Sequence, residues 1–139
     1  MYENFVRMIY DALKLNIEQA DPDFRRVYKH CCERLELDNP EIYLFSLSDS
    51  DDKAEPANWI FRNGQLVAPA NHRHYKGFCR QFNRDIFIRA HLTKQETLLT
   101  LSHELYHLWE YKIGKSYVDE DLAEDFAIET YNKIINNKL

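Results

Sequence analysis

The sequence predicts an α+β domain, in which helices and strands occupy different stretches of the chain. Apolar residues recur at helical spacing near both ends, in residues 2–37 and 94–136. Between these stretches lie short apolar runs rich in β-branched and aromatic residues, in residues 42–47 and 59–90. The chain has 139 residues with only 3 Gly and 4 Pro, which suits one folded domain, residues 1–139, with a core of ordinary size.

The composition excludes several classes of partner. A formal net charge of −5 disfavours direct binding to nucleic acid, which requires the neutralisation of phosphates. The three cysteines, Cys31, Cys32 and Cys79, are an odd number without the spacing of a disulfide framework, so we expect free thiols in a reducing compartment. The first residues do not resemble a signal peptide, and no apolar run reaches membrane-spanning length. We therefore expect a cytoplasmic protein with no membrane partner, of an oligomeric state that the sequence does not indicate.

Two helices are expected at the N-terminal end. The first covers residues 2–17, where Phe5, Ile9 and Leu13 recur at helical spacing. The second begins at Asp21, an N-cap residue followed by Pro22 at the first helical position, and extends to about residue 37. Its inner face is predicted to consist of Phe24, Val27, Tyr28, Cys31 and Leu35.

A small, largely antiparallel sheet of three or four strands is expected in the middle of the chain. Residues 42–47 and 85–90 have strand composition, and Asn63–Gly64 between residues 59–61 and 66–68 is a strong hairpin signal. Residues 48–58 are polar and acidic and are predicted to form a solvated loop. The basic and aromatic residues 70–84 are expected to line a peptide groove or to form an exposed connection, since the acidic chain disfavours a nucleic-acid patch.

The helix predicted between Thr93 and Gly114 carries the most informative motif. Thr93 and Glu96 have the spacing of a capping box, and Gly114 suits the position that ends a helix. At about 100° per residue, the leucines and Ile113 fall on one broad face, which is predicted to face the core, and a polar group falls on the other. That polar group consists of Thr100, His103, Glu104, His107, Glu110 and Tyr111. We therefore expect the helix to pack through its leucine face.

His103, Glu104 and His107 form an H-E-x-x-H motif on this helix. Residues four apart lie one turn apart on the same face, so both imidazoles can bind one Zn²⁺. The glutamate between them can accept a proton from the attacking water, which is the general-base role of this motif in metallopeptidases. The sequence therefore predicts His103 and His107 as zinc ligands and Glu104 as the catalytic residue.

A third protein ligand is expected from the last helix, predicted over residues 119–136. Helical projection favours Glu120, because it shares a face with Ala127 and Ile134. The path of the chain favours Glu124, because two antiparallel helices joined by a short loop place residues near 124 at the level of the histidines. Glu120 can serve only if residues 115–118 run back along the motif helix before the last helix begins.

At this point the chain resembles the zincin metallopeptidases, and among them the ImmA/IrrE-type family, over residues 85–131. The resemblance is carried by H-E-x-x-H and by a later E-x-x-A-x-x-F-A, which here begins at Glu120 and ends at Ala127. It implies a zincin-like domain whose C-terminal helix pair carries the metal site. It also implies His103, His107 and Glu120 as the Zn²⁺ ligands. Two departures are Glu124, where the family usually has Asn, and a short gap between His107 and Glu120.

The predicted function is zinc-dependent hydrolysis of peptide bonds in a protein substrate. The resemblance implies a repressor or regulator encoded by a mobile element as that substrate. Candidate donors to the developing oxyanion are Tyr111, Tyr117 and His91, chosen by proximity in sequence. Two alternatives stay open. One is a binding or structural module that keeps the metal and acts through residues 70–84, and the other is a toxin or effector that requires the same metal site.

Overall fold

The computed structural model describes residues 13–45, 60–62, 65–67, 76–90 and 92–136. Several sequence predictions lie outside these residues. They are residues 2–12 of the first predicted helix, the acidic loop 48–58, the hairpin turn Asn63–Gly64, residues 70–75 of the basic and aromatic segment, and the oxyanion candidate His91.

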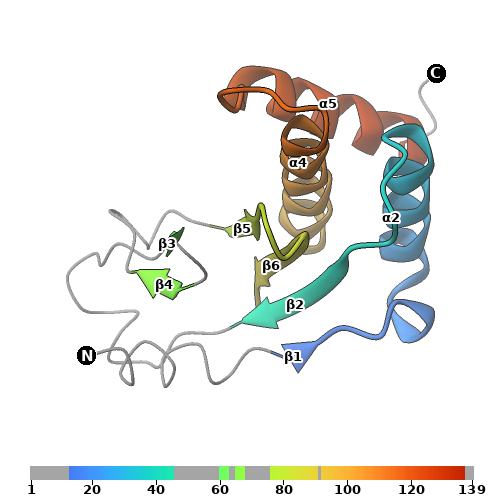
Figure 1. Cartoon of the computed structure of the whole chain (residues 1–139). Coiled ribbons are helices and arrows are strands. Elements are labelled where there is room, and N and C mark those ends of the chain that lie inside the picture. Colours follow the sequence, from blue (N-terminus) through green and yellow to red (C-terminus); the bar gives the residue numbers. More distant parts are fainter. Residues whose placement is uncertain (1–12, 46–59, 63–64, 68–75, 91, 137–139) are drawn as a thin grey trace.

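Three α-helices in the described part of the chain lie where the sequence predicts them (Figure 1). They are α2 (Pro22–Arg34), α4 (Lys94–Lys112) and α5 (Glu120–Ile134). The side chain of Asp21 caps α2 by accepting from the backbone N–H groups of Asp23 and Phe24. The capping box of α4 is also confirmed, with Thr93 and Glu96 each accepting from the other's backbone. Among the described residues, no helix combines the length and the apolar character needed to cross a membrane.

The helix predicted over residues 2–17 is wrong for its described end. Leu13–Lys14 form the short strand β1, and Ile17–Gln19 form the 3₁₀ helix η1. Lys14 pairs with Tyr43, and the N–H of Leu15 donates to the carbonyl of Ile42 at 2.7 Å. Pairing with a neighbouring strand satisfies these backbone groups, so tertiary context overrides a weak helical pattern.

The main sheet is mixed. Its order is β1, β2 (Glu41–Phe45), β6 (Asp85–Arg89) and β5 (Gly77–Arg80). The two outer pairings are antiparallel, but the central pair β2–β6 is parallel, so the expectation of a largely antiparallel sheet missed the arrangement at its centre. A parallel pair needs a long crossover, and the chain between β2 and β6 is long enough to provide one.

Strand β5 corrects a second prediction, because it lies in the segment expected to be a loop. Phe78 pairs with Phe87 of β6, and their rings stack with centroids 5.0 Å apart. Arg80 forms an ion pair with Asp85, its register partner on β6. These cross-strand contacts explain why a basic and aromatic segment forms an edge strand. The predicted hairpin is confirmed as β3 (Ile60–Arg62) and β4 (Gln65–Val67), which pair antiparallel.

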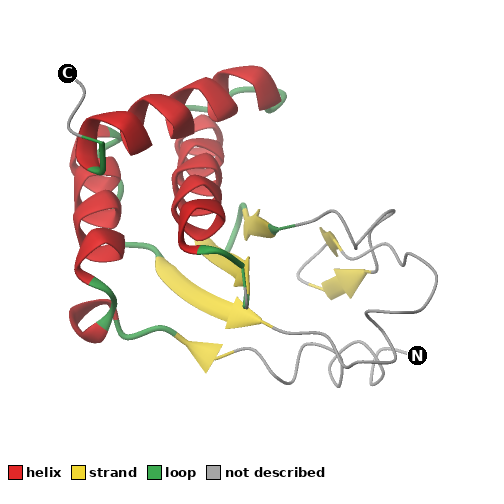
Figure 2. Ribbon diagram, turned by 180° about the vertical axis from the view of Figure 1, so that it is seen from behind, coloured by secondary structure: helices red, strands yellow, loops and turns green. Residues whose placement is uncertain are grey.

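The helices pack against each other and on the sheet to form one core. Ile42, Ile86 and Ile88 of the sheet are fully buried in the same cluster as Val27 of α2 and Leu101 of α4. Helix α5 lies across both α4 and α2, as seen from opposite sides in Figures 1 and 2. This crossing brings the beginning of α5 to the polar face of α4.

The polar face of α4 is therefore not left to solvent. Contacts with α5 and β5 bury Thr100, Glu104, His107 and Glu110, whereas Ile113, predicted to face the core, is half exposed. The expectation that α4 packs through its leucine face is confirmed, since Leu98, Leu101, Leu105 and Leu108 are buried, but α5 and β5 cover the opposite side as well. A buried polar face needs partners for its charges, and those partners form the site.

Candidate metal centre

His103 and His107 lie one turn apart on α4 and point to the same place. Their Nε2 atoms are 3.0 Å apart, and their ring planes are nearly perpendicular, at 81°. His107 is buried, and the His103 side chain is 16% exposed. The continuous helix fixes both imidazoles, so the spacing predicted from the motif is the spacing that the structure shows.

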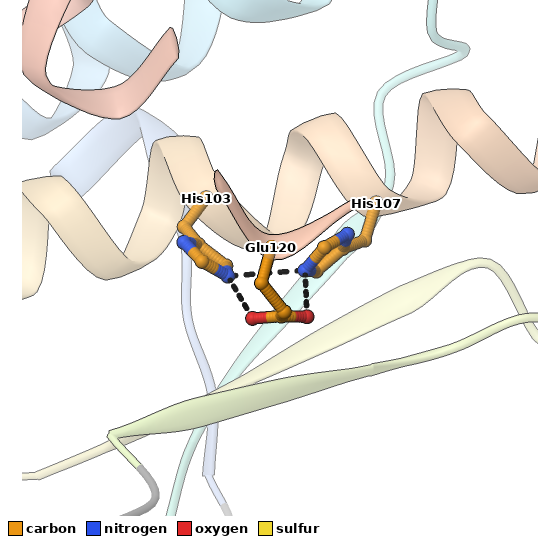
Figure 3. Close-up of side chains that lie close together, drawn as sticks. All are labelled: His103, His107 and Glu120. Atoms are coloured by element: carbon orange, nitrogen blue, oxygen red, sulfur yellow. Dashed lines mark hydrogen bonds and ion pairs between the residues drawn. The ribbon is translucent and has the colours of Figure 1, made fainter. Parts of the chain in front are cut away.

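Glu120, the first residue of α5, places its carboxylate across both imidazoles (Figure 3). Its Oε2 lies 3.0 Å from Nε2 of His103, and its Oε1 lies 2.8 Å from Nε2 of His107. The three ligand atoms are all within 4.8 Å of one another. The group formed by His103, His107 and Glu120 could therefore hold a metal ion.

The loop between the two helices explains how Glu120 reaches this position. After α4 ends, the backbone N–H of Lys115 donates to the carbonyl of Glu110 at 3.0 Å. The N–H of Asp119 then donates to the side chain of Glu110, also at 3.0 Å. The loop thus runs back along α4, and α5 begins beside the last turns of that helix. This is the path that the sequence argument required for Glu120.

Glu124 makes a different contact. Its Oε2 lies 3.1 Å from Nδ1 of His103, on the side of the imidazole away from Glu120. Glu124 does lie at the level of the histidines, as the path of the chain predicts. Its carboxylate contacts only His103, however, and does not lie between the two rings. Glu124 therefore has the geometry of an outer hydrogen-bond partner.

The three converging groups fit a small divalent cation such as Zn²⁺. Zinc takes imidazole nitrogen and carboxylate oxygen at about 2.0–2.2 Å, which puts tetrahedral ligands about 3.4 Å apart. The observed separations of 2.8 to 3.0 Å are slightly shorter, so a small outward movement of the side chains would suffice. Two histidines with one carboxylate are also a ligand set that leaves a fourth position open.

Glu104 lies beside this group without joining it. Its side chain is buried, with 8% of the residue exposed, and it faces Cys79 of β5. Burial raises the pKa of its carboxyl above the usual value, although His103, His107 and the Cys79 thiol act in the opposite direction. A carboxylate whose pKa is raised in this way is a better proton acceptor near neutral pH.

An open cleft of about 750 Å³ leads to these residues. One wall is β5 with the residue before it, and the other comes from α4 and the start of α5. The walls include Lys76, Cys79, His103, Glu104, Tyr111 and Glu124. The cleft is thus large enough for a segment of a larger substrate, since pockets for ligands span about 300–1,000 Å³.

Of the described candidates for an oxyanion donor, Tyr111 lines the cleft and Tyr117 does not. Burial raises the pKa of Tyr111 to about 12, so its hydroxyl stays protonated and can donate a hydrogen bond. Tyr117 is 69% exposed.

Sequence reasoning assigned no role to two residues of the site. Glu110 lies on the predicted polar face three positions after His107, and this spacing is the signal that could have indicated a contact. Cys79 reaches Glu104 only through the packing of β5 on α4, so no local pattern indicates it. The other two cysteines are free and buried, as expected.

Comparisons of the chain with protein-family models, curated proteins and solved structures gave no match. The interpretation of the site therefore depends on the chemistry and geometry of its own residues.

Proposed function

We propose that the protein is a zinc-dependent metallopeptidase that hydrolyses peptide bonds in a protein substrate. The observation that carries this proposal is the convergence of His103, His107 and Glu120 on one point, next to a buried glutamate that is not part of the group. In this proposal the first three residues hold Zn²⁺. The ion, when bound, polarises the scissile carbonyl and lowers the pKa of water.

The remaining residues have roles that follow from where they lie. Glu104 accepts the proton of the attacking water and later passes it to the leaving amine, since its carboxylate is beside both histidines and its pKa is raised. Tyr111 donates a hydrogen bond from its neutral hydroxyl group to the developing oxyanion in the cleft. The resemblance to ImmA/IrrE-type peptidases favours a repressor or regulator as the substrate.

The alternative of a binding module that acts through residues 70–84 has less support. In the described part of that segment, Phe78 stacks on Phe87 and Arg80 pairs with Asp85, so these side chains are engaged within the sheet. The same strand contributes a wall of the cleft beside Glu104. These contacts suit a structural wall of an active site better than a surface for a separate partner.

Hydrolysis of a mixture of fluorescence-quenched peptides tests the proposal. The zinc-loaded protein is expected to cleave some of the peptides, and a chelator should abolish the activity. Glu104→Gln should retain the fold and one Zn²⁺ per chain but lose about 10²–10⁴-fold in rate, because the amide cannot accept the proton. Unimpaired cleavage by Glu104→Gln would refute the general-base role, and zinc binding with no cleavage by either protein would contradict the hydrolytic function.

A further inference from the structure

The Glu110 side chain is buried, and it lies one turn after His107 on α4. Its Oε1 is 2.7 Å from Nδ1 of His107. Its Oε2 accepts from the ammonium group of Lys115 at 3.1 Å and from the backbone N–H of Asp119 at 3.0 Å. Burial of an ionised carboxylate is costly without such partners, so three donors around one side chain indicate a specific role.

The contact with His107 determines which imidazole nitrogen carries the proton. An ionised carboxylate only accepts hydrogen bonds, so Nδ1 of His107 must donate to Glu110. The lone pair of the neutral ring is then on Nε2, the atom that faces Glu120 at 2.8 Å. The ammonium group of Lys115 and the backbone N–H of Asp119 also donate to this carboxylate, and such donors favour its ionised form.

The contact with Asp119 links the same carboxylate to α5. Asp119 is the N-cap of α5 and immediately precedes Glu120. A hydrogen bond to its N–H therefore fixes the backbone one residue before the carboxylate that faces both histidines. Lys115 strengthens this link from within the loop, where its ammonium group also lies 5.9 Å from the centre of the Trp109 ring.

His103 has no equivalent arrangement. Its Nδ1 faces Glu124, but the side chain of Glu124 is 54% exposed, whereas that of Glu110 is 1% exposed. Water competes with the first contact and is excluded from the second. Of the two outer carboxylates, Glu110 is thus the one that is held rigidly and that contacts both helices of the site.

We propose that Glu110 is a positioning residue of the metal centre, which holds His107 as the Nδ1–H tautomer and places the start of α5 so that Glu120 completes the group. This inference rests on the proposed metal site, but it concerns contacts that exist without the ion. Outer partners of metal-binding histidines typically contribute about 10–100-fold to metal affinity.

The test combines two measurements on the full chain. The first is a histidine side-chain ¹⁵N spectrum of the metal-free protein, recorded at alkaline pH where imidazoles are neutral. The second is the affinity for Zn²⁺ alone, measured by competition with a chelator, for the wild type, Glu110→Gln and Lys115→Met. Glu129→Gln is the matched control, because Glu129 is an exposed glutamate that pairs with Arg34 and does not contact the site.

We expect the Nδ1–H tautomer for His107 in the wild type and in Lys115→Met. Glu110→Gln should lose about 10–100-fold in zinc affinity, because its amide group cannot accept from both His107 and Asp119. Lys115→Met should lose less, since it removes only one donor and leaves the contact with His107, and Glu129→Gln should bind zinc like the wild type.

Two results would overturn the inference: an Nε2–H tautomer of His107 in the wild type, or a Glu110→Gln variant that binds zinc as tightly as the wild type. If Glu110→Gln does not fold, the tautomer of His107 in the wild type still tests the inference. Failure of the proposed function has a different signature, because a wild type that takes up no Zn²⁺ would refute the metal site whatever the tautomer of His107.

Discussion

Two glutamates one turn apart on α5 place carboxylates against the histidines of α4, and the contacts differ in kind. Glu120 lies within 3.0 Å of both Nε2 atoms, whereas Glu124 lies 3.1 Å from Nδ1 of His103. The Nδ1 atom is on the far side of the ring from the point where the group converges. The geometry thus favours Glu120 as a ligand and Glu124 as a partner that orients one ligand.

This difference predicts unequal effects of two matched substitutions. Glu120→Gln should lower zinc affinity by more than about 100-fold, the upper end of the range for outer partners, because it weakens a ligand itself. Glu124→Gln should lose about 10-fold or less, because its side chain is half exposed and its amide oxygen can still accept from His103. Chelator competition measures both variants, and a larger loss for Glu124→Gln would show that the assignment is wrong.

At the scale of single residues, the sequence predicted the positions of the motif but not all of its surroundings. His103, Glu104 and His107 follow from local helical spacing alone. The choice of Glu120 over Glu124 depended on the path of the loop, and projection with a family resemblance was enough to favour it. The contact of Glu110 with His107 follows from their spacing on α4, but its contact with Asp119 depends on how α5 packs against that helix. Cys79 could not be assigned a role, since its contact depends on how β5 packs on α4.

Among the helices and strands, too, local patterns predicted some elements, and others depended on contacts elsewhere in the fold. The sequence predicted α2, α4 and α5 well, because helix caps and helical spacing involve residues that are close together in the sequence. Strand β1 was missed because it pairs with β2, a strand distant in sequence. Strand β5 was missed although it pairs with β6, the next strand along the chain, because its basic and aromatic segment has the composition of an exposed connection. The missed β5 matters most for the site, since it forms one wall of the cleft.

The close packing of β5 on α4 requires glycine at position 77. A Cβ there would lie 2.6 Å from Cγ2 of Thr100 and 2.7 Å from the carbonyl oxygen of Phe87. Gly77→Ala should therefore destabilise the fold by about 1–3 kcal/mol, as overpacking does. Thr100→Ser removes the Cγ2 atom, so part of this loss should be recovered in the double variant, with a coupling energy of about 0.5 kcal/mol or more in denaturant unfolding.

Gly114→Ala provides the control for this coupling. It is also expected to destabilise the fold, because Gly114 has a φ of 82°, but a Cβ there meets nothing within 4 Å. Its effect should add to that of Thr100→Ser without coupling. A purely additive result for Gly77→Ala with Thr100→Ser would show that β5 and α4 are not in the close contact described.

At the scale of the whole molecule, the α+β class was predicted correctly, but the mixed sheet was not. The parallel pairing of β2 with β6 depends on a crossover that local patterns do not encode. The crossing of α5 over α4 and α2 was likewise outside the reach of sequence patterns (Figure 1). That crossing has the largest functional consequence, since it brings Glu120 to the histidines and closes the site between two helices.

The central claim is that these two helices together hold a zinc ion. The most direct measurement is a crystal structure of the protein grown with Zn²⁺, with anomalous data collected on both sides of the zinc absorption edge. The account predicts one strong anomalous peak, about 2.0–2.2 Å from Nε2 of His103, Nε2 of His107 and the carboxylate of Glu120, with Glu104 outside the coordination sphere. An empty site at saturating zinc, or a zinc ion ligated by Glu124 in place of Glu120, would contradict it.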